Sequence, residues 1–422
     1  MRAPMPPTRA RHTMLGFALA AMAVAYLDRV CISTAAPSIQ ADLGLSDLQM
    51  GTVFSAFTLT YALFEVPSGW LADRFGARVT LTRIVLWWSA MTAATGAATG
   101  FGSLVVLRGL FGMGEAGVLP SLTRAFGRWL PLRERGRAFG LTIMAAALGG
   151  AVTQPLVALL LGVVSWRMAF PIFGSVGVVW AIAWWRWFRD EPREHRGVDA
   201  AELALIGCEP ASERHPRVPW RRLLRNRTML ALCAMYFGAI YGWYFYLTWL
   251  PTYLLRARGF DLKAAGALAA LPLLGIAAGS LLGGATSDAL TRRFGMRTGL
   301  RLPGLVGLPL AALAIVGAIH TRQPTAAAVF FAAAAGLAAL GVAPAWSVCL
   351  AVGGRHAGVV SGAMNTFGNL GGVASPLAMG WGLAALGSWD LSLYSVVFFY
   401  GLAALCWLGI DPAARIDLDH AE

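Results

Sequence analysis

Charged side chains are scarce in this 422-residue sequence, where Asp, Glu, Lys and Arg together make up 13% of the residues. Soluble domains carry charge at about a quarter of their positions. Hydrophobic residues account for 57% instead, and the mean hydropathy is +0.62. One soluble core could not bury this much apolar material. The composition therefore excludes an ordinary soluble protein and predicts a membrane protein.

Cysteine is also rare, and its positions follow no pattern. The five cysteines are Cys31, Cys208, Cys233, Cys349 and Cys406. Their spacing matches neither a disulfide framework nor a metal site. We expect them to be packing residues. No nucleophile-and-base or metal-ligand constellation is found in the sequence, so we expect no enzyme activity, no metal and no cofactor.

Lysine occurs once, at Lys263, and arginine supplies the other positive charges behind the net charge of +13. Nucleic-acid binding would require a basic polar surface with aromatic platforms. The arginines occupy short gaps between apolar runs instead, so we expect no nucleic-acid partner. The preference for arginine is typical of a GC-rich bacterial source and hence predicts the inner (plasma) membrane.

Long apolar runs fill most of the chain. Twelve runs are long enough to cross a bilayer as helices. They lie near residues 14–36, 49–71, 80–100, 103–126, 137–160, 167–188, 228–251, 264–286, 300–320, 324–347, 356–382 and 389–410. A stretch rich in Arg, Glu and Pro separates the first six runs from the last six.

These runs predict an all-α integral membrane protein with twelve transmembrane helices in two six-helix bundles. The predicted parts are an N-terminal bundle (1–188), a cytosolic linker (189–227), a C-terminal bundle (228–411) and a cytosolic tail (412–422).

Arginines are distributed unequally between the two sides of the predicted membrane. With the N-terminus inside, the inner loops receive Arg74, Arg78, Arg124, Arg128, Arg133, Arg135, Arg137, Arg292, Arg293, Arg297 and Arg301. The outer loops receive mainly Arg167, Arg256, Arg258, Lys263 and Arg322. Cytosolic loops carry the excess of positive residues, so we expect both termini to be cytosolic.

Four charged residues lie away from the ends of the first and fourth apolar runs. Arg108 and Glu115 are two helical turns apart in the fourth run and share one helix face, while Asp28 and Arg29 are adjacent in the first run. A charge at mid-membrane costs roughly 2.5 to 3.5 kcal/mol, so such residues face a bundle interior or a water-filled path. Arg108 could pair with Asp28 or with Glu115. The group indicates ion or anion traffic, and a purely structural ion-pair network is the alternative.

The two halves also repeat. Asp73 and Asp288 follow the second and eighth runs, 215 residues apart. The sequence LGG followed by PL occurs in the fifth run at 148–156 and again in the eleventh at 370–377. Such repeats are typical of transporters built from two related bundles.

The predicted loop after the second run reads GWLADRFGAR. Gly69 and Gly76 permit a tight turn, and Asp73 can cap the next helix or hold an arginine. Arg74 and Arg78 agree with a cytosolic position.

This loop resembles the signature of the major facilitator superfamily, and residues 284–295 with Asp288, Arg292 and Arg293 resemble its weaker second copy. The resemblance implies a transporter in which this loop is a latch between helices and exchanges partners as the bundles rock.

A narrower resemblance covers nearly the whole chain. The segment YLDRVCISTAAPSI (26–39), the segment LRGLFGMGEAG (107–117), LTWLP with Tyr253, and Asn365 within MNTFGN resemble the anion:cation symporter family. That family includes bacterial sugar-acid carriers and vesicular glutamate-type carriers.

This resemblance implies roles for the charged residues. Arg29 would bind the substrate carboxylate, Asp28 and Glu115 would take up protons, and Arg108 would couple them. Positions that line the family's pocket are matched by Tyr26, Tyr61, Trp346 and Asn365. From the sequence itself, Tyr244 is a further pocket candidate, and Glu65 is expected to pair with a loop arginine.

The sequence departs from sugar-acid carriers in the fifth and tenth runs, where Ala146, Ala343 and Ala345 replace polar groups. A polyol would then leave hydroxyls unpaired at roughly 1 to 3 kcal/mol each. We therefore expect a poorly hydroxylated organic anion, such as an aromatic or short-chain carboxylate or a sulfonate.

The sequence thus predicts a monomeric secondary active transporter that imports a small organic anion by proton symport through alternating access. One alternative is a proton-coupled exporter of drugs or metabolites, although the fifth run lacks the Gly-Pro antiporter motif. A second alternative is a membrane sensor that has kept the fold.

Overall fold

The computed structural model describes residues 8–207, 225–354 and 357–413, apart from the side chains of Val66, Asp73, Leu132 and Arg133. Every regular element within these ranges is a helix. In chain order they are α1 (Ala10–Leu43), α2 (Asp47–Thr95), α3 (Phe101–Glu115), α4 (Val118–Trp129), α5 (Leu132–Leu161), α6 (Trp166–Trp187), η1 (Pro192–Glu194), α7 (Ala200–Ile206), α9 (Arg227–Thr248), α10 (Leu250–Arg256), α11 (Leu262–Phe294), α12 (Met296–His320), α13 (Pro324–Ala339), α14 (Val342–Gly353), α15 (Ala357–Leu386) and α16 (Trp389–Gly409).

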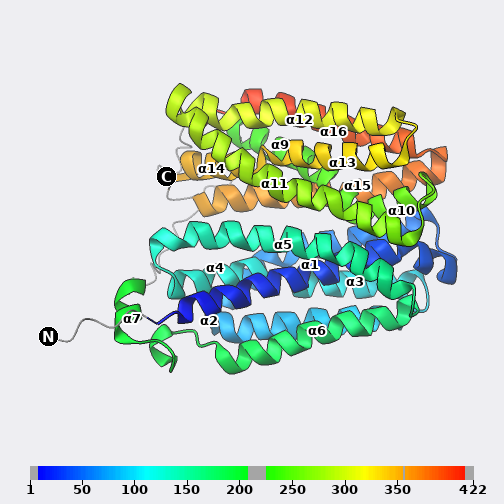
Figure 1. Ribbon diagram of the computed structural model, residues 1–422. Helices are drawn as coiled ribbons and strands as arrows, with labels where there is room; N and C mark the ends of the chain where they lie inside the picture. Colours follow the sequence, from blue (N-terminus) through cyan, green and yellow to red (C-terminus); the bar gives the residue numbers. More distant parts are fainter. Residues whose placement is uncertain (1–7, 208–224, 355–356, 414–422) are drawn as a thin grey trace.

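The long helices form two bundles that lie side by side (Figure 1). Helices α1 to α6 make one bundle, and α9 to α16 make the other. They meet where α15 packs on α2 and where α11 packs on α5. We call the end of the molecule that carries α7 the linker end, and the opposite end the far end.

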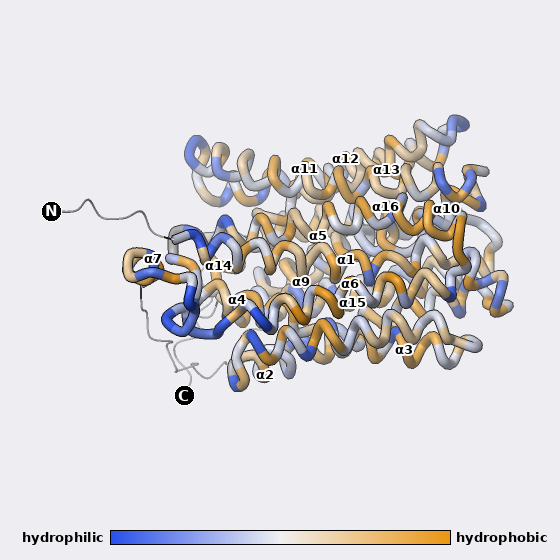
Figure 2. Tube along the Cα trace, turned by 60° about the horizontal axis from the view of Figure 1, so that its bottom comes forward, coloured by the Kyte–Doolittle hydropathy of each residue, from blue (hydrophilic) through white to orange (hydrophobic). Residues whose placement is uncertain are grey.

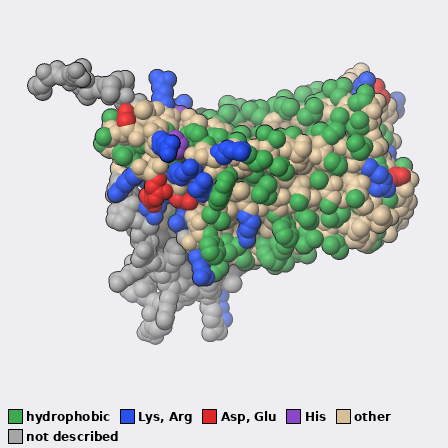
Figure 3. Space-filling view, turned by 90° about the horizontal axis from the view of Figure 1, so that it is seen from below, with side chains coloured by type: hydrophobic (Ala, Val, Ile, Leu, Met, Phe, Trp, Pro, Cys, Tyr) green, Lys and Arg blue, Asp and Glu red, His purple; other side chains and the backbone are tan. Residues whose placement is uncertain are grey.

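The exterior between the two ends is apolar. Val179, Leu313 and Leu350 are among the exposed side chains there, and charged residues gather toward the two ends (Figures 2 and 3). In the described part of the chain, nine helical stretches are long and apolar enough to cross a membrane. The count of twelve spans and the cytosolic position of the termini stay predictions.

Gly76 divides α2 into the two runs expected at 49–71 and 80–100. Its backbone has φ 83° and ψ 163°, and Gly295, between α11 and α12, has φ 83° and ψ 165°. Side-chain-bearing residues almost never adopt this conformation. Both glycines lie in a Phe-Gly-X-Arg sequence, at 75–78 and 294–297, so the two halves repeat the same turn.

The repeated LGG sequences allow two helix pairs to approach closely. A methyl group at Gly149 of α5 would lie 2.7 Å from the Cα of Ala23 in α1, and one at Gly371 of α15 would lie 3.1 Å from the carbonyl carbon of Phe237 in α9. Each glycine thus permits contact between backbones, in equivalent places in the two bundles.

Contacts between the bundles close the far end. Ser55 of α2 donates to the carbonyl oxygen of Val373 in α15, at 2.8 Å. Arg256 at the end of α10 bonds Asp47 at 2.8 Å and Gln40 at 3.0 Å, both in the other bundle. We call these contacts the far-end seal.

The linker carries a short helix that the sequence analysis did not predict. From α7, the buried Glu202 accepts hydrogen bonds from the Thr8 hydroxyl (2.6 Å), the Ala10 and Arg11 amides (3.2 and 3.1 Å) and the Arg11 guanidinium (3.0 Å). Arg11 also pairs with Glu134 of α5 at 3.2 Å. A carboxylate at a helix N-terminus satisfies free amides there, so α7 is held against the N-terminal bundle.

Candidate functional site

A guanidinium from α1 and a carboxylate from α3 meet inside the N-terminal bundle. Arg29 donates to Glu115 Oε1 from Nε, at 3.2 Å, and from Nη2. Glu115 is the last residue of α3, where the fourth run breaks before α4, whose N-cap is Gly117. Its second oxygen, Oε2, is buried and accepts from no described residue.

Aromatic rings surround the Arg29 guanidinium. Its central carbon lies 4.8 Å from the ring centre of Tyr26, 4.9 Å from that of Phe57 and 5.0 Å from that of Tyr61. Rings at these distances attract a cation and hold its plane. The Arg29 side chain remains 13% exposed, and no described residue accepts from its Nη1. These N–H groups are free for an anion.

The fourth-run arginine packs against aromatic rings. Arg108 is 2% exposed, and its guanidinium carbon lies 4.4 Å from the ring centre of Phe111 and 5.2 Å from that of Phe57. It makes no ion pair with a described carboxylate, so the pairing with Asp28 or Glu115 that the sequence left open is not seen. Phe111 follows Arg108 by three residues and precedes Glu115 by four on α3, so all three side chains share one helix face.

Asp28 has a different environment from its neighbour Arg29, as the angle between adjacent helical residues predicts. It is completely buried, and neither carboxylate oxygen is hydrogen-bonded to a described residue. Trp88 and Thr92 of α2 lie beside it, and Arg108 is within electrostatic range. A buried ionised carboxylate without a partner is very costly.

The C-terminal bundle reaches this region through Asn365 of α15. Its Nδ2 donates to both carboxylate oxygens of Glu65 in α2, each at 3.1 Å. The expected pairing of Glu65 with a loop arginine is therefore wrong among the described residues. Glu65 lies one turn beyond Tyr61, so its side chain points to the gap between the bundles rather than to the loop.

Two predicted pocket residues of the C-terminal bundle, Trp346 and Tyr244, differ in their exposure. Trp346 of α14 is 40% exposed and donates from Nε1 to the hydroxyl of Tyr236, at 3.3 Å. Tyr244 of α9 is buried but within electrostatic range of Arg29. Tyr236, which the sequence analysis did not select, could have been found only through its helical spacing of eight residues from Tyr244.

The three alanines that are predicted to replace the polar groups of sugar-acid carriers do not lie on one surface. Ala345 and Ala146 are 0% and 2% exposed, so they pack within their bundles rather than line an accessible wall. Ala343 is partly exposed. The expected absence of polar partners therefore stays a prediction.

The loop after the second run is anchored by the linker. Asp190 accepts from the backbone amides of Ala77 and Arg78, at 2.6 and 3.2 Å. Arg78 in turn donates to the carbonyl oxygen of Trp185 at the end of α6. A methyl group at Gly76 would lie 2.7 Å from the Asp190 carboxylate, so the glycine is needed for this contact as well as for the turn.

The other predicted loop residues have weaker contacts. Arg74 lies over the rings of Trp70 and Phe75, at 5.4 Å from each centre. Gly69 is partly exposed, and Asp288 in the second copy is exposed. The side chain of Asp73 lies outside the described residues.

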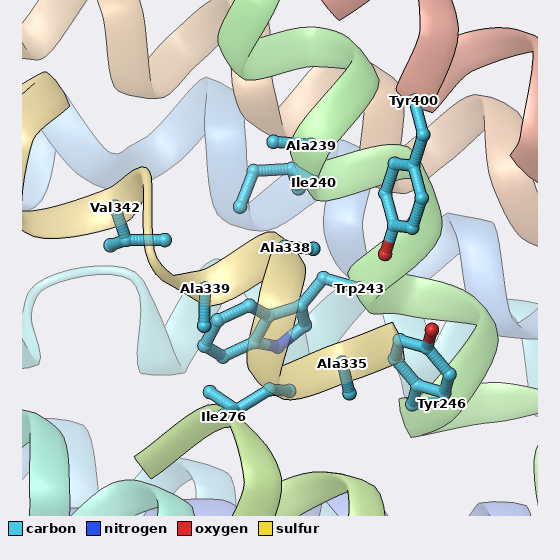
Figure 4. Close-up of a pocket in the computed structure, with 10 residues that line it drawn as sticks. All are labelled: Ala239, Ile240, Trp243, Tyr246, Ile276, Ala335, Ala338, Ala339, Val342 and Tyr400. Carbon is cyan, nitrogen blue, oxygen red and sulfur yellow. The ribbon is translucent and has the colours of Figure 1, made fainter. Parts of the chain in front are cut away.

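A small cavity lies within the C-terminal bundle (Figure 4). Trp243, Tyr246 and Tyr400 line it together with Ile276 and apolar residues of α13. Its volume of about 10 Å³ is the space of about one water molecule. An organic anion does not fit there, so this cavity is not the binding site.

The profile of the Major Facilitator Superfamily matches residues 18–376. The chain belongs to the major facilitator superfamily. It is accordingly a multi-pass membrane transporter and not an enzyme.

The relatives of this transporter match nearly its whole length. It is 38% identical to a probable sulfoacetate transporter of Cupriavidus necator over 97% of this chain and 96% of that protein. It is 31% identical to a D-galactonate transporter of Escherichia coli, with 89% and 90% covered. A bacterial homolog of the human lysosomal transporter Spinster shares the fold, with a TM-score of 0.76 and 22% identity over 94% of this chain and 96% of that one.

Proposed function

We propose that this transporter imports a small organic anion together with protons by alternating access. The observation that carries the proposal is Arg29, a partly exposed guanidinium with free N–H groups in a buried site that also holds Asp28 and Glu115. A planar guanidinium binds a carboxylate or sulfonate through two parallel hydrogen bonds. The relatives named as sulfoacetate and D-galactonate transporters support an anionic substrate.

Competition for Arg29 would link the anion to a proton. Arg29 donates hydrogen bonds from two N–H groups to Glu115. An anion bound at the free edge of the guanidinium would share the Arg29 charge with Glu115, and a buried carboxylate that is only partly compensated is costly unless it binds a proton. Asp28, which is buried without an ion-pair partner among the described residues, is the second proposed proton carrier, and Arg108 is the fixed charge near both.

The substrate we propose is a short, poorly hydroxylated carboxylate or sulfonate. Tyr26, Phe57 and Tyr61 present ring faces to the guanidinium, and ring faces offer no hydrogen-bond partners to a row of hydroxyls. Tyr244, Trp346 and Asn365 are proposed as further binding residues on the C-terminal side.

Alternating access would open and close the two ends in turn. The far-end seal closes one end, and at the other end the loop residues Gly69, Asp73, Arg74, Gly76, Arg78 and Asp288 are proposed to act as the latch. With both termini cytosolic, the sealed end would face the outside. Two protons with a monoanion carry one net positive charge inward, and each such charge gains about 2.3 kcal/mol per 100 mV.

The division into bundles 1–188 and 228–411, with linker 189–227 and tail 412–422, is part of the proposal. So are a monomeric state and a location in the inner membrane.

The decisive experiment uses purified protein in liposomes that contain a pH-sensitive dye. Sulfoacetate, short and aromatic carboxylates and D-galactonate are added outside, with an Arg29→Ala variant beside the wild type. We expect acidification with the sulfonate or a short carboxylate, lost in the variant. Acidification with D-galactonate alone would refute the substrate class, and uptake of an anion without acidification would refute proton symport.

A further inference from the structure

Glu65 and Asn365 make a polar contact between the two bundles that the proposed mechanism does not use. One amide nitrogen bonds both oxygens of one carboxylate, at 3.1 Å each. The residues come from α2 and α15, the same helices that form part of the far-end seal. Glu65 is ten residues beyond Ser55 along α2, or about 15 Å toward the linker end.

The Glu65 carboxylate has no positively charged partner among the described residues. No described Lys, Arg or His lies within ion-pair distance of it. The groups that face it are Arg29 from α1 at longer range, Tyr61 from its own helix, Tyr236 from α9 and Asn365 from α15. The amide of Asn365 is therefore its only hydrogen-bond donor in the described part of the chain.

We propose that Glu65 is a positioning residue of the transport cycle, which holds α15 against α2 through Asn365 and favours the conformation with the far end closed. Ionised, the carboxylate accepts both hydrogen bonds. Protonated, it has an O–H of its own and accepts less well, so the bond between the bundles depends on its charge. Arg29 and Tyr61 place this bond next to the proposed anion site. The inference rests on the proposed alternation between two conformations.

Exchanging the chemistry of the two residues tests the contact itself. Asn365→Asp places two carboxylates face to face, and Glu65→Gln removes the charge but keeps the shape. The double variant Glu65→Gln/Asn365→Asp restores an amide-to-carboxylate bond with the roles reversed. Ser361→Asp is the matched control, because it adds a carboxylate one turn away on the same helix.

The measurement is the distance distribution between spin labels at positions 137 and 292. Arg137 of α5 and Arg292 of α11 are exposed at the linker end of opposite bundles. The background protein has its native cysteines replaced and is first shown to take up substrate. Opening of the far end brings these labels together, so the two conformations give two distances.

We expect Asn365→Asp to shift the ratio of the two populations by about tenfold toward the short distance, since a hydrogen bond to a charged group is lost. The double variant should return to the wild-type ratio within about twofold, the error of such a cycle, and Ser361→Asp should not shift it. The inference is overturned if Asn365→Asp leaves the ratio of the two populations unchanged. It is also overturned if the ratio in the double variant is no closer to the wild-type ratio than that of the single variant with the larger shift. A single distance in the wild type, with and without anion, would instead overturn the proposed alternation, and the inference with it.

Discussion

Arg29 is the residue on which the proposed function depends most directly. We predict that Arg29→Lys weakens anion binding strongly even though the positive charge is kept. An ammonium on a flexible stem lacks the planar fork. A guanidinium can present one edge to Glu115 and another to a ligand while it lies among the rings of Tyr26, Phe57 and Tyr61. An ammonium has no such edges.

The magnitude follows from the hydrogen bonds at stake. A hydrogen bond to a charged group contributes about 1.5 to 3 kcal/mol. Losing one of two bonds, as in Arg29→Lys, should raise the dissociation constant by about 10- to 100-fold. Arg29→Ala loses both and should raise it by at least about 100-fold.

Binding is measured by calorimetry on detergent-solubilised protein and by substrate counterflow in liposomes, where no proton gradient is needed. Arg83→Ala is the control, because Arg83 is an exposed arginine of α2 outside the site. A dissociation constant for Arg29→Lys within threefold of wild type would refute the bidentate argument. Equal effects of Arg83→Ala and Arg29→Ala would show that only the overall charge matters.

Three further predictions concern coupling and stability. Glu115→Gln should abolish proton-driven accumulation but spare counterflow, and unchanged accumulation would contradict its proton-carrying role. Gly76→Ala should lower the melting temperature measured by scanning fluorimetry, because a side chain at φ 83° is strained and would overlap Asp190; no change would show that the turn relaxes. Glu202→Ala should destabilise the protein by about 3 to 5 kcal/mol, since it leaves the buried Arg11 guanidinium without a main partner, whereas Glu202→Gln should cost less.

Helix content and the turns were accessible from the sequence because they depend on local chemistry. Apolar run length determines where a helix can cross a membrane, and Phe-Gly-X-Arg marks the two turns at Gly76 and Gly295. The superfamily was accessible for the same reason, since its signature lies in one short loop. The short helix α7 was not, because its burial depends on a contact between Glu202 and a segment nearly 200 residues away.

The pairing of charges could not be read from the sequence. Spacing places Arg108 and Glu115 on one helix face, but which arginine bonds Glu115 depends on how α1 lies against α3. In the structure Arg29 is the arginine that bonds Glu115, and Arg108 packs on the ring of Phe111. Likewise Glu65 and Asn365 are 300 residues apart, and nothing local to either residue indicates the other.

Charge balance in the buried site gives the strongest physical reason to expect coupling. Arg29 and Arg108 supply two positive charges, and Asp28 and Glu115 supply two negative charges when both are ionised. An arriving monoanion would leave this group with one uncompensated negative charge, in an environment where such a charge is very costly. A proton on either carboxylate restores neutrality. Anion entry and proton entry therefore favour each other for as long as both arginines stay charged, and a variant in which a carboxylate is neutral beforehand should bind the anion without needing the proton.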